Sequence, residues 1–217
     1  MIVAVCGGKG GVGKTTVALN LGAAPSTVVV DADLGMADLP ADNGPTLHDV
    51  LADRASVEQA LHQRGQLTLL PGGRSLAALR AADPAQLVSV LESLADRYDR
   101  VVVDCPAGLA ADVGLALYAA DRSVLVTTPD HVALPDAVRT RALVRVLDAG
   151  VQRVVLNKAD AAPPTDAVRE ALGIPVEVLP ADDRIVDATT AGQPVAVRYP
   201  DTAPAKAMAR LVDAVFD

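Results

Sequence analysis

The run Gly8-Lys9-Gly10-Gly11-Val12-Gly13-Lys14-Thr15 follows a short apolar segment, residues 2–6, and precedes a helical stretch, residues 15–21. It matches the pattern G-x-x-x-x-G-K-[ST], in which glycines let the backbone curl so that successive N–H groups point at phosphate oxygens. The N-terminus of the following helix adds the positive end of its dipole. We therefore predict a phosphate-binding loop, with the Lys14 ammonium on the outer phosphates and the Thr15 hydroxyl on Mg²⁺.

Short apolar segments alternate with helical stretches along the rest of the chain. Nearly continuous Val, Leu and Ile runs fit strands that are buried on both faces, and strand–helix alternation favours a parallel sheet. No internal repeat or linker interrupts this order. We predict one α/β domain over residues 1–217, a doubly wound, mostly parallel sheet with helices on both faces, as in P-loop NTPases. The predicted strands are residues 2–6, 27–30, 67–70, 100–103, 123–127, 153–156 and 176–179.

Polar side chains stand where several of these strands end. Asp31 and Asp33 follow the second predicted strand, Asp104 follows the strand at 100–103, and Asn157 follows the strand at 153–156. Ligands of such sheets bind beyond the carboxyl ends of the strands. These side chains and the glycine loop are therefore expected to meet at one edge of the sheet.

Charge and composition limit the classes of partner. The net charge is −8, and two of the four lysines lie in the glycine loop, so strong binding to DNA or anionic lipid is not expected. No apolar run reaches the roughly 18 residues of a membrane-spanning helix, and the N-terminus lacks a signal-peptide pattern, so we expect a cytoplasmic protein. Cys6 and Cys105 form no Cys-x-x-Cys pair and are expected to be buried and not catalytic.

Lys9 adds a second lysine near the start of the loop, and Lys9-Gly-Gly-Val-Gly-Lys-Thr-Thr16 resembles the deviant Walker A motif of the MinD/ParA family of ATPases. Residues 30–38 resemble the switch I of that family. Residues 103–108 resemble its Walker B and switch II, with Cys105 in place of serine. Further similarities to the MinD-like branch, especially its archaeal members, lie at residues 46–51, 70–73, 126–130, 179–183, 191–195 and 199–204, so the resemblance covers nearly the whole chain in order.

The resemblance implies roles for individual residues around ATP or ADP and Mg²⁺. Lys9 would cross a dimer interface to the partner's nucleotide, and Asp33 would orient the attacking water. Asp31 and Asp104 would hold Mg²⁺ through waters, beside the Thr15 hydroxyl. The implied catalytic residues are thus Lys9, Lys14 and Asp33, and the implied metal site is Thr15, Asp31 and Asp104. The implied nucleotide contacts are Gly8, Lys9, Gly10, Gly11, Val12, Gly13, Lys14, Thr15, Thr16, Asn157 on adenine, and the backbone of Pro180, Ala181 and Asp182.

The function that the resemblance implies is a slow, partner-stimulated ATPase that acts as a spatial switch. ATP would close a homodimer, hydrolysis would open it, and an unknown protein partner or activator would read the cycle to position division machinery or another structure. Members that bind membranes directly often carry a basic amphipathic tail. Here Met208, Leu211, Val212 and Val215 form an apolar stripe flanked by acidic residues, which favours a packed terminal helix and no autonomous membrane binding.

Three alternatives remain open at the level of sequence. Asn157-Lys158-Ala159-Asp160 also spells the N-K-x-D signature of P-loop GTPases, whose aspartate accepts hydrogen bonds from guanine. An iron–sulfur carrier on the same fold would need a Cys-x-x-Cys, which the sequence lacks. A DNA-partitioning ATPase of the ParA type would need a basic surface, which the net charge disfavours.

Overall fold

The structure, a computed structural model, describes residues 1–41, 43–108, 111–130 and 133–217. Eight strands form one sheet in the order β3-β4-β2-β5-β1-β6-β7-β8, and every neighbouring pair is parallel except β3 with β4. The strands are β1 (Ile2–Cys6), β2 (Thr27–Asp31), β3 (His62–Arg64), β4 (Leu67–Leu70), β5 (Arg100–Asp104), β6 (Arg122–Thr127), β7 (Val151–Ala159) and β8 (Val176–Pro180).

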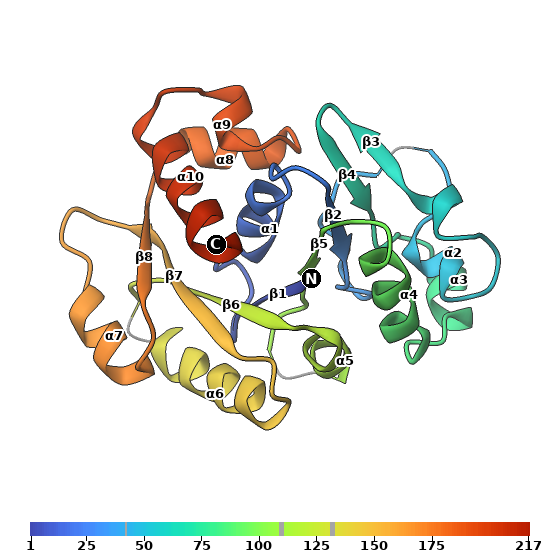
Figure 1. The fold of residues 1–217 in the computed structure, drawn as a ribbon, viewed down its shortest axis with the longest axis horizontal. Coiled ribbons are helices and arrows are strands. Elements are labelled where there is room, and N and C mark those ends of the chain that lie inside the picture. The colour runs from blue at the N-terminus through green and yellow to red at the C-terminus, as the bar shows by residue number, and fades with distance from the viewer. Residues whose placement is uncertain (42, 109–110, 131–132) are drawn as a thin grey trace.

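Helices cover both faces of this sheet (Figure 1). On one face α1, α8, α9 and α10 pack over the sheet, and α4, α5, α6 and α7 pack on the other. The doubly wound α/β architecture predicted from the sequence is therefore confirmed. The helices are α1 (Lys14–Leu21), α2 (Leu47–Val50), α3 (Leu76–Ala81), α4 (Gln86–Ala95), α5 (Ala111–Ala119), α6 (Ala133–Val146), α7 (Thr165–Leu172), α8 (Asp183–Thr190), α9 (Val195–Arg198) and α10 (Ala203–Phe216), with a short 3₁₀ turn at Glu58–Ala60.

The central strand β1 shows why the core forms. Its side chains alternate between the two faces, so Val3 and Val5 join one apolar cluster while Ala4 and Cys6 join the other, and all four are fully buried. Burying one Val side chain contributes about 1.5–3 kcal/mol. Because β1 is supported from both sides, the loop that leaves its carboxyl end starts from a fixed position.

The largest differences from the predicted strands lie at β3 and β7. The edge strand β3 was not predicted, because His62-Gln63-Arg64 has no apolar run and joins the sheet only through an antiparallel hairpin with β4. Strand β7 extends beyond the predicted 153–156, so that Asn157 lies within it. Its pairing with β8 shifts between Leu156 and Ala159, and Lys158 there has φ 56. The hydrogen-bond ladder between β7 and β8 is thus interrupted at Asn157 and Lys158.

The last helix, α10, packs against the domain as its apolar stripe predicts. Met208, Leu211 and Val215 are buried in the cluster beneath α1, and Val212 packs against that cluster. Among the residues that the structure describes, no helix combines the length and apolarity needed to cross a bilayer.

Candidate functional site

The glycine loop connects β1 to α1 at the carboxyl edge of the sheet. Gly11 and Gly13 have φ of 76° and 101°, which a residue with a side chain adopts only under strain. A Cβ on Gly13 would also lie 2.1 Å from Nδ2 of Asn157, and one on Gly8 would lie 2.6 Å from the carbonyl oxygen of Asp136. The backbone therefore needs glycine at these positions to pack this closely, which a phosphate cradle requires.

Helix α1 begins at Lys14 with Gly13 as its N-cap, and no side chain caps it. Its first N–H groups have no intrahelical partner, as at every helix start, so they can bind an anion. Lys14 is only 9% exposed, and its positive charge acts on the neighbouring Cys6 and Asp104. The helix start thus combines orphan donors with a nearly buried ammonium.

Two carboxylates end adjacent strands beneath this loop. Asp31 of β2 is in register with Asp104 of β5, and both are buried. Burial is the main cause that raises the pKa of Asp31 to about 6 and the pKa of Asp104 well above its usual range, and the proximity of Asp31 raises the latter further. A cation at this point would relieve the repulsion.

Mg²⁺ fits the donors that the structure offers here. Oδ1 of Asp104 is buried without a hydrogen-bond partner among the described residues, and the neighbouring Thr15 hydroxyl lowers the pKa of the same carboxyl group. Mg²⁺ prefers oxygen ligands and usually keeps several waters instead of an all-protein cage. The described part of the chain contains no cluster of three or more His, Cys, Asp or Glu side chains arranged for a metal ion.

Asp31 also shapes the loop that follows β2. Its carboxylate accepts backbone N–H bonds from Asp33 at 3.1 Å and from Asp38 and Leu39 at 3.0 Å each. Asp33 itself is half-buried, and its Oδ1 accepts the N–H of Met36 at 2.9 Å. The Asp31 carboxylate therefore holds the backbone of this loop, and Asp33 lies in the turn that its bond to Met36 closes.

The end of β7 contacts the glycine loop directly. Asn157 is 3% exposed, and its Nδ2 donates to the carbonyl oxygen of Val12 at 2.8 Å. Lys158 donates from Nζ to the carbonyl oxygen of Gly11, also at 2.8 Å. Sequence reasoning predicted a contact of Asn157 with adenine, and what the structure shows is a contact of its amide with the glycine loop.

The segment after β8 forms the N-terminal cap of α8. Asp182 accepts the N–H of Arg184 at 2.9 Å and forms an ion pair with the same residue, whose guanidinium lowers the pKa of Asp182 to about 2. The N–H of Ala181 donates to the carbonyl oxygen of Ala159 at 2.9 Å, which ties the segment to β7. Pro180–Asp182 therefore contributes backbone to this edge of the sheet, while the Asp182 side chain acts as a helix cap.

Lys9 and Asp160 lie on the other side of the glycine loop. The Lys9 ammonium is 3.6 Å from Oδ2 of Asp130, and both side chains are nearly half exposed. Asp160 accepts the N–H of Ala162 at 3.1 Å. Lys9, Asp130 and Asp160 line a cavity of about 330 Å³. Its other lining residues are Gly10, Gly11, Val12, Thr128, Pro129 and Lys158.

A larger cavity of about 510 Å³ opens over the start of α1. Lys14, Thr15 and Thr16 form its floor, whereas Asp31, Asp33 and Asp104 do not line it. Its other walls include residues that sequence reasoning missed, because they come from distant segments. Thr189 of α8, for example, donates to the Thr16 hydroxyl oxygen at 3.2 Å. The full lining is Gly11, Gly13, Lys14, Thr15, Thr16, Asp38, Pro40, Arg74, Lys158, Val186, Thr189 and Thr190.

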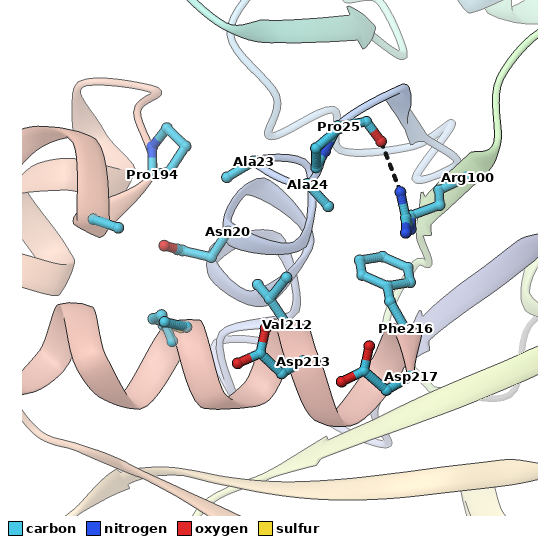
Figure 2. Close-up of a pocket in the computed structure, with 13 residues that line it drawn as sticks. Asn20, Ala23, Ala24, Pro25, Arg100, Pro194, Val212, Asp213, Phe216 and Asp217 are labelled. Atoms are coloured by element: carbon cyan, nitrogen blue, oxygen red, sulfur yellow. Dashed lines mark hydrogen bonds between the residues drawn. The ribbon is translucent and has the colours of Figure 1, made fainter.

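A third cavity, of about 320 Å³, lies at the opposite edge of the sheet, between the end of α1 and α10 (Figure 2). Arg100, the first residue of β5, donates to the carbonyl oxygen of Pro25 at 2.8 Å and stacks 4.8 Å from the ring centroid of Phe216. None of the motif residues lines this cavity. Residues of the glycine loop line the two cavities that flank it, whereas Asp31, Asp33 and Asp104 line neither of them.

The two cysteines flank this site without entering it. Cys6 and Cys105 are buried, and burial raises the pKa of Cys6 to about 12 and that of Cys105 well above its usual range. Each thiol contacts a backbone carbonyl oxygen, that of Val124 or Val103. A thiol that stays protonated is a poor nucleophile, so these contacts support the structural role expected from the sequence.

Comparison with known proteins agrees with this geometry. Residues 1–148 match a family model described as an AAA domain. The septum site-determining protein MinD of Synechocystis is 33% identical over 89% of this chain and 81% of its own length. The cell division ATPase MinD of Pyrococcus furiosus superposes with a TM-score of 0.92 at 33% identity, over 99% of this chain and 97% of its own.

A further solved structure, the septum site-determining protein MinD of Pyrococcus horikoshii complexed with Mg-ADP, gives a TM-score of 0.93 at 31% identity. It covers all of this chain and 96% of its own. The matches in sequence and in structure cover nearly the whole chain. The chain is therefore a member of the MinD/ParA family of P-loop ATPases.

Proposed function

We propose that this protein is an ATP-driven molecular switch built on one ATPase domain. ATP with Mg²⁺ closes a homodimer, hydrolysis opens it, and the cycle positions cell-division or other cellular machinery through a protein partner or activator. The observation that carries the proposal is the glycine loop with its two lysines. Lys14 is nearly buried at the helix start, while the side chain of Lys9 is 48% exposed on the other side of the loop. One lysine can thus serve the chain's own nucleotide while the other reaches a second copy.

The proposed reaction needs positioning more than covalent chemistry. The oxygen of a water attacks the terminal phosphorus of ATP, the bond to the bridging oxygen breaks, and ADP leaves with that oxygen. One proton of the water stays on the inorganic phosphate and the other passes to solvent. Lys14 and the N–H groups of α1 hold the phosphate charge. Thr15 and Asp104 would hold Mg²⁺, which would supply positive charge to the outer phosphates. Asp33 accepts a hydrogen bond from the water once its loop closes over the nucleotide.

The preference for adenine comes from the glycine loop and residues 30–38, and not from Asn157. The carbonyl oxygen of Val12 accepts one N–H of the Asn157 NH₂, which leaves the second N–H and Oδ1 of the same amide to pair with either base. Asp160, the residue that would read guanine, lies in the smaller cavity with Lys9. Lys9 and residues 30–38 resemble the second lysine and the switch I of MinD/ParA ATPases, and this resemblance supports an adenine nucleotide.

The protein is accordingly expected to bind ATP more tightly than GTP. The measurement is a titration with fluorescent ATP and GTP analogues in the presence of Mg²⁺. We expect at least a tenfold preference for ATP, about 1.4 kcal/mol. An Asp160→Ala variant is the matched control, because it removes the candidate guanine ligand and should leave both affinities unchanged. Tighter binding of GTP, or loss of GTP binding in Asp160→Ala, would assign the site to guanine.

Removing one of the paired carboxylates is expected to stabilise the nucleotide-free protein and to abolish its response to Mg²⁺. Asp104→Asn removes the repulsion with Asp31, and each 1 kcal/mol gained should raise the melting temperature by about 2–4 °C. Because the pKa values of both carboxyl groups are raised in the native state, native protein binds more protons near pH 5 than unfolded protein, and stability falls as pH rises.

The gain from Asp104→Asn should therefore be large at pH 7.5 and small at pH 5, measured by thermal melts. Mg²⁺ added with ATP should raise the melting temperature of the parent above the value with ATP alone, but not that of the variant. Asp96→Asn, at an exposed carboxylate, is the control and should change neither result. A loss of stability in Asp104→Asn at pH 7.5 would contradict the paired-charge account.

We propose that a protein partner, and not direct binding to DNA or lipid, recruits this protein to the structure that it positions. The net charge of −8 and the packed face of α10 support weak intrinsic affinity for DNA and for lipid vesicles. A pulldown from cell extract, with and without ATP, would identify the partner and the structure that is positioned. Cosedimentation with anionic vesicles is the companion measurement, and ATP-dependent pelleting of the purified protein would contradict the need for a recruiting partner.

A further inference from the structure

Arg74 stands at the mouth of the 510 Å³ cavity, on a loop whose backbone is held in place. The loop follows β4. The carbonyl oxygen of Pro71 accepts the N–H of Leu47 at 2.8 Å, and the carbonyl oxygen of Gly72 accepts the N–H of His48 at 3.1 Å. Pro71, Gly72 and Gly73 are buried, whereas Arg74 is exposed. The base of the arginine is thus fixed while its side chain is open to the cavity.

Gly73 shows how closely this loop is packed. Its φ is 104°, and a Cβ there would lie 2.5 Å from Oγ1 of Thr46 and 2.9 Å from Nδ1 of His48. His48 is 2% exposed and contacts the carbonyl oxygen of Leu34 through Nε2 at 2.9 Å. The start of α2 therefore connects the Arg74 loop to the loop that carries Asp33. The position of Arg74 is coupled to the part of the site where hydrolysis is proposed.

The charges that line the cavity favour a polyphosphate. Lys14, Lys158 and Arg74 supply three cations against one carboxylate, that of Asp38, in a chain whose net charge is −8. Lys158 is already bound to the carbonyl oxygen of Gly11. The Arg74 guanidinium has no hydrogen bond or ion pair with any of the described residues. An unpaired guanidinium presents a planar set of donors that suits phosphate oxygens.

The sheet order indicates which phosphate Arg74 faces. Outward from β1, which leads into the glycine loop, come β5 with Asp104, β2 with Asp31, and then β4 with the Arg74 loop. The opposite wall of the cavity comes from α8, which follows β8 on the other side of the sheet. Arg74 thus approaches from the side of the metal carboxylates, where the terminal phosphate of a triphosphate would lie.

We propose that Arg74 donates hydrogen bonds to the terminal phosphate of the ATP bound by its own chain, and so distinguishes ATP from ADP. This inference rests on the proposed function, since it assumes that the nucleotide occupies the 510 Å³ cavity. A guanidinium supplied from within the same chain would add positive charge at the phosphoryl group that is transferred.

The test compares two affinities in one variant. Arg74→Ala should weaken binding of a non-hydrolysable ATP analogue with Mg²⁺ by about tenfold, or 1.4 kcal/mol, and change the affinity for ADP by less than twofold. Arg74→Lys should recover part of the loss, because an ammonium keeps the charge but not the fork of donors. Arg80→Ala, at an exposed arginine on the next helix, is the control and should bind both nucleotides like the parent.

The outcomes separate this inference from the proposed function. Equal affinities of parent and Arg74→Ala for the ATP analogue, or equal losses for the ATP analogue and ADP, would overturn the assignment of Arg74 while the parent still binds ATP. A parent that binds neither nucleotide would overturn the proposed function and this inference with it. Because Arg74 is exposed and makes no described polar contact, the thermal melt of Arg74→Ala without nucleotide should match that of the parent.

Discussion

Lys14→Ala is expected to abolish nucleotide binding while the fold remains intact. The ammonium lies at the start of α1, is 9% exposed, and lines the 510 Å³ cavity. Hydrogen bonds to charged groups contribute about 1.5–3 kcal/mol each, and one ammonium can serve two phosphate groups. The expected loss of ATP affinity is therefore at least about a hundredfold, as 1.4 kcal/mol corresponds to a factor of ten.

The measurement is equilibrium binding of a fluorescent ATP analogue, with thermal melts beside it. ATP with Mg²⁺ should raise the melting temperature of the parent and leave that of Lys14→Ala unchanged. Alanine is the strongest helix former, so α1 should tolerate it. Lys206→Ala, at an exposed lysine on α10, is the matched control for loss of one lysine and should bind ATP like the parent. Binding by Lys14→Ala within threefold of the parent would remove the glycine loop from the nucleotide site.

The central part of the fold could be predicted from the sequence because its strands are buried on both faces. The bounds of β1 and β4 agree with the prediction, and the other predicted strands differ by one to three residues at their ends. Strand β3 could not be predicted, since its three polar residues carry no apolar signal and only the hairpin with β4 makes them a strand. Periodicity reports burial, and an exposed edge has little of it.

The candidate site likewise has residues that the sequence could predict and residues that it could not. The glycine loop and the carboxylates at the ends of β2 and β5 could be predicted, because a local motif and the ends of buried strands mark them. Arg74 and Thr189 could not, because packing between distant segments brings them to the cavity. The contact of Lys9 with Asp130 is likewise a tertiary feature that no spacing in the sequence reports.

Asp33→Ala and Lys9→Ala are expected to have opposite effects on the dimer, and their contrast tests the switch. Lys9 contacts Asp130 outside the 510 Å³ cavity, so Lys9→Ala should bind ATP within about threefold of the parent, 0.6–0.7 kcal/mol. If its ammonium serves the nucleotide of the partner subunit, the variant should remain monomeric with ATP. Size-exclusion chromatography with a non-hydrolysable ATP analogue and Mg²⁺ reads this directly, and Lys206→Ala should dimerise like the parent.

Asp33→Ala should retain ATP and Mg²⁺, lose turnover by at least about a hundredfold, or 2.7 kcal/mol, and accumulate as a closed dimer with ATP itself. Only the group that orients the water is removed, while the Asp31 carboxylate that holds the loop backbone stays. Asp33→Asn is the companion variant, because its amide oxygen can still accept the Met36 N–H, so a loss of turnover there reflects the carboxylate and not the loop. A phosphate-release assay beside chromatography reads both variants. If Asp33→Ala stays monomeric with ATP, or hydrolyses it at the rate of the parent, then ATP closure and hydrolysis are not linked through this carboxylate.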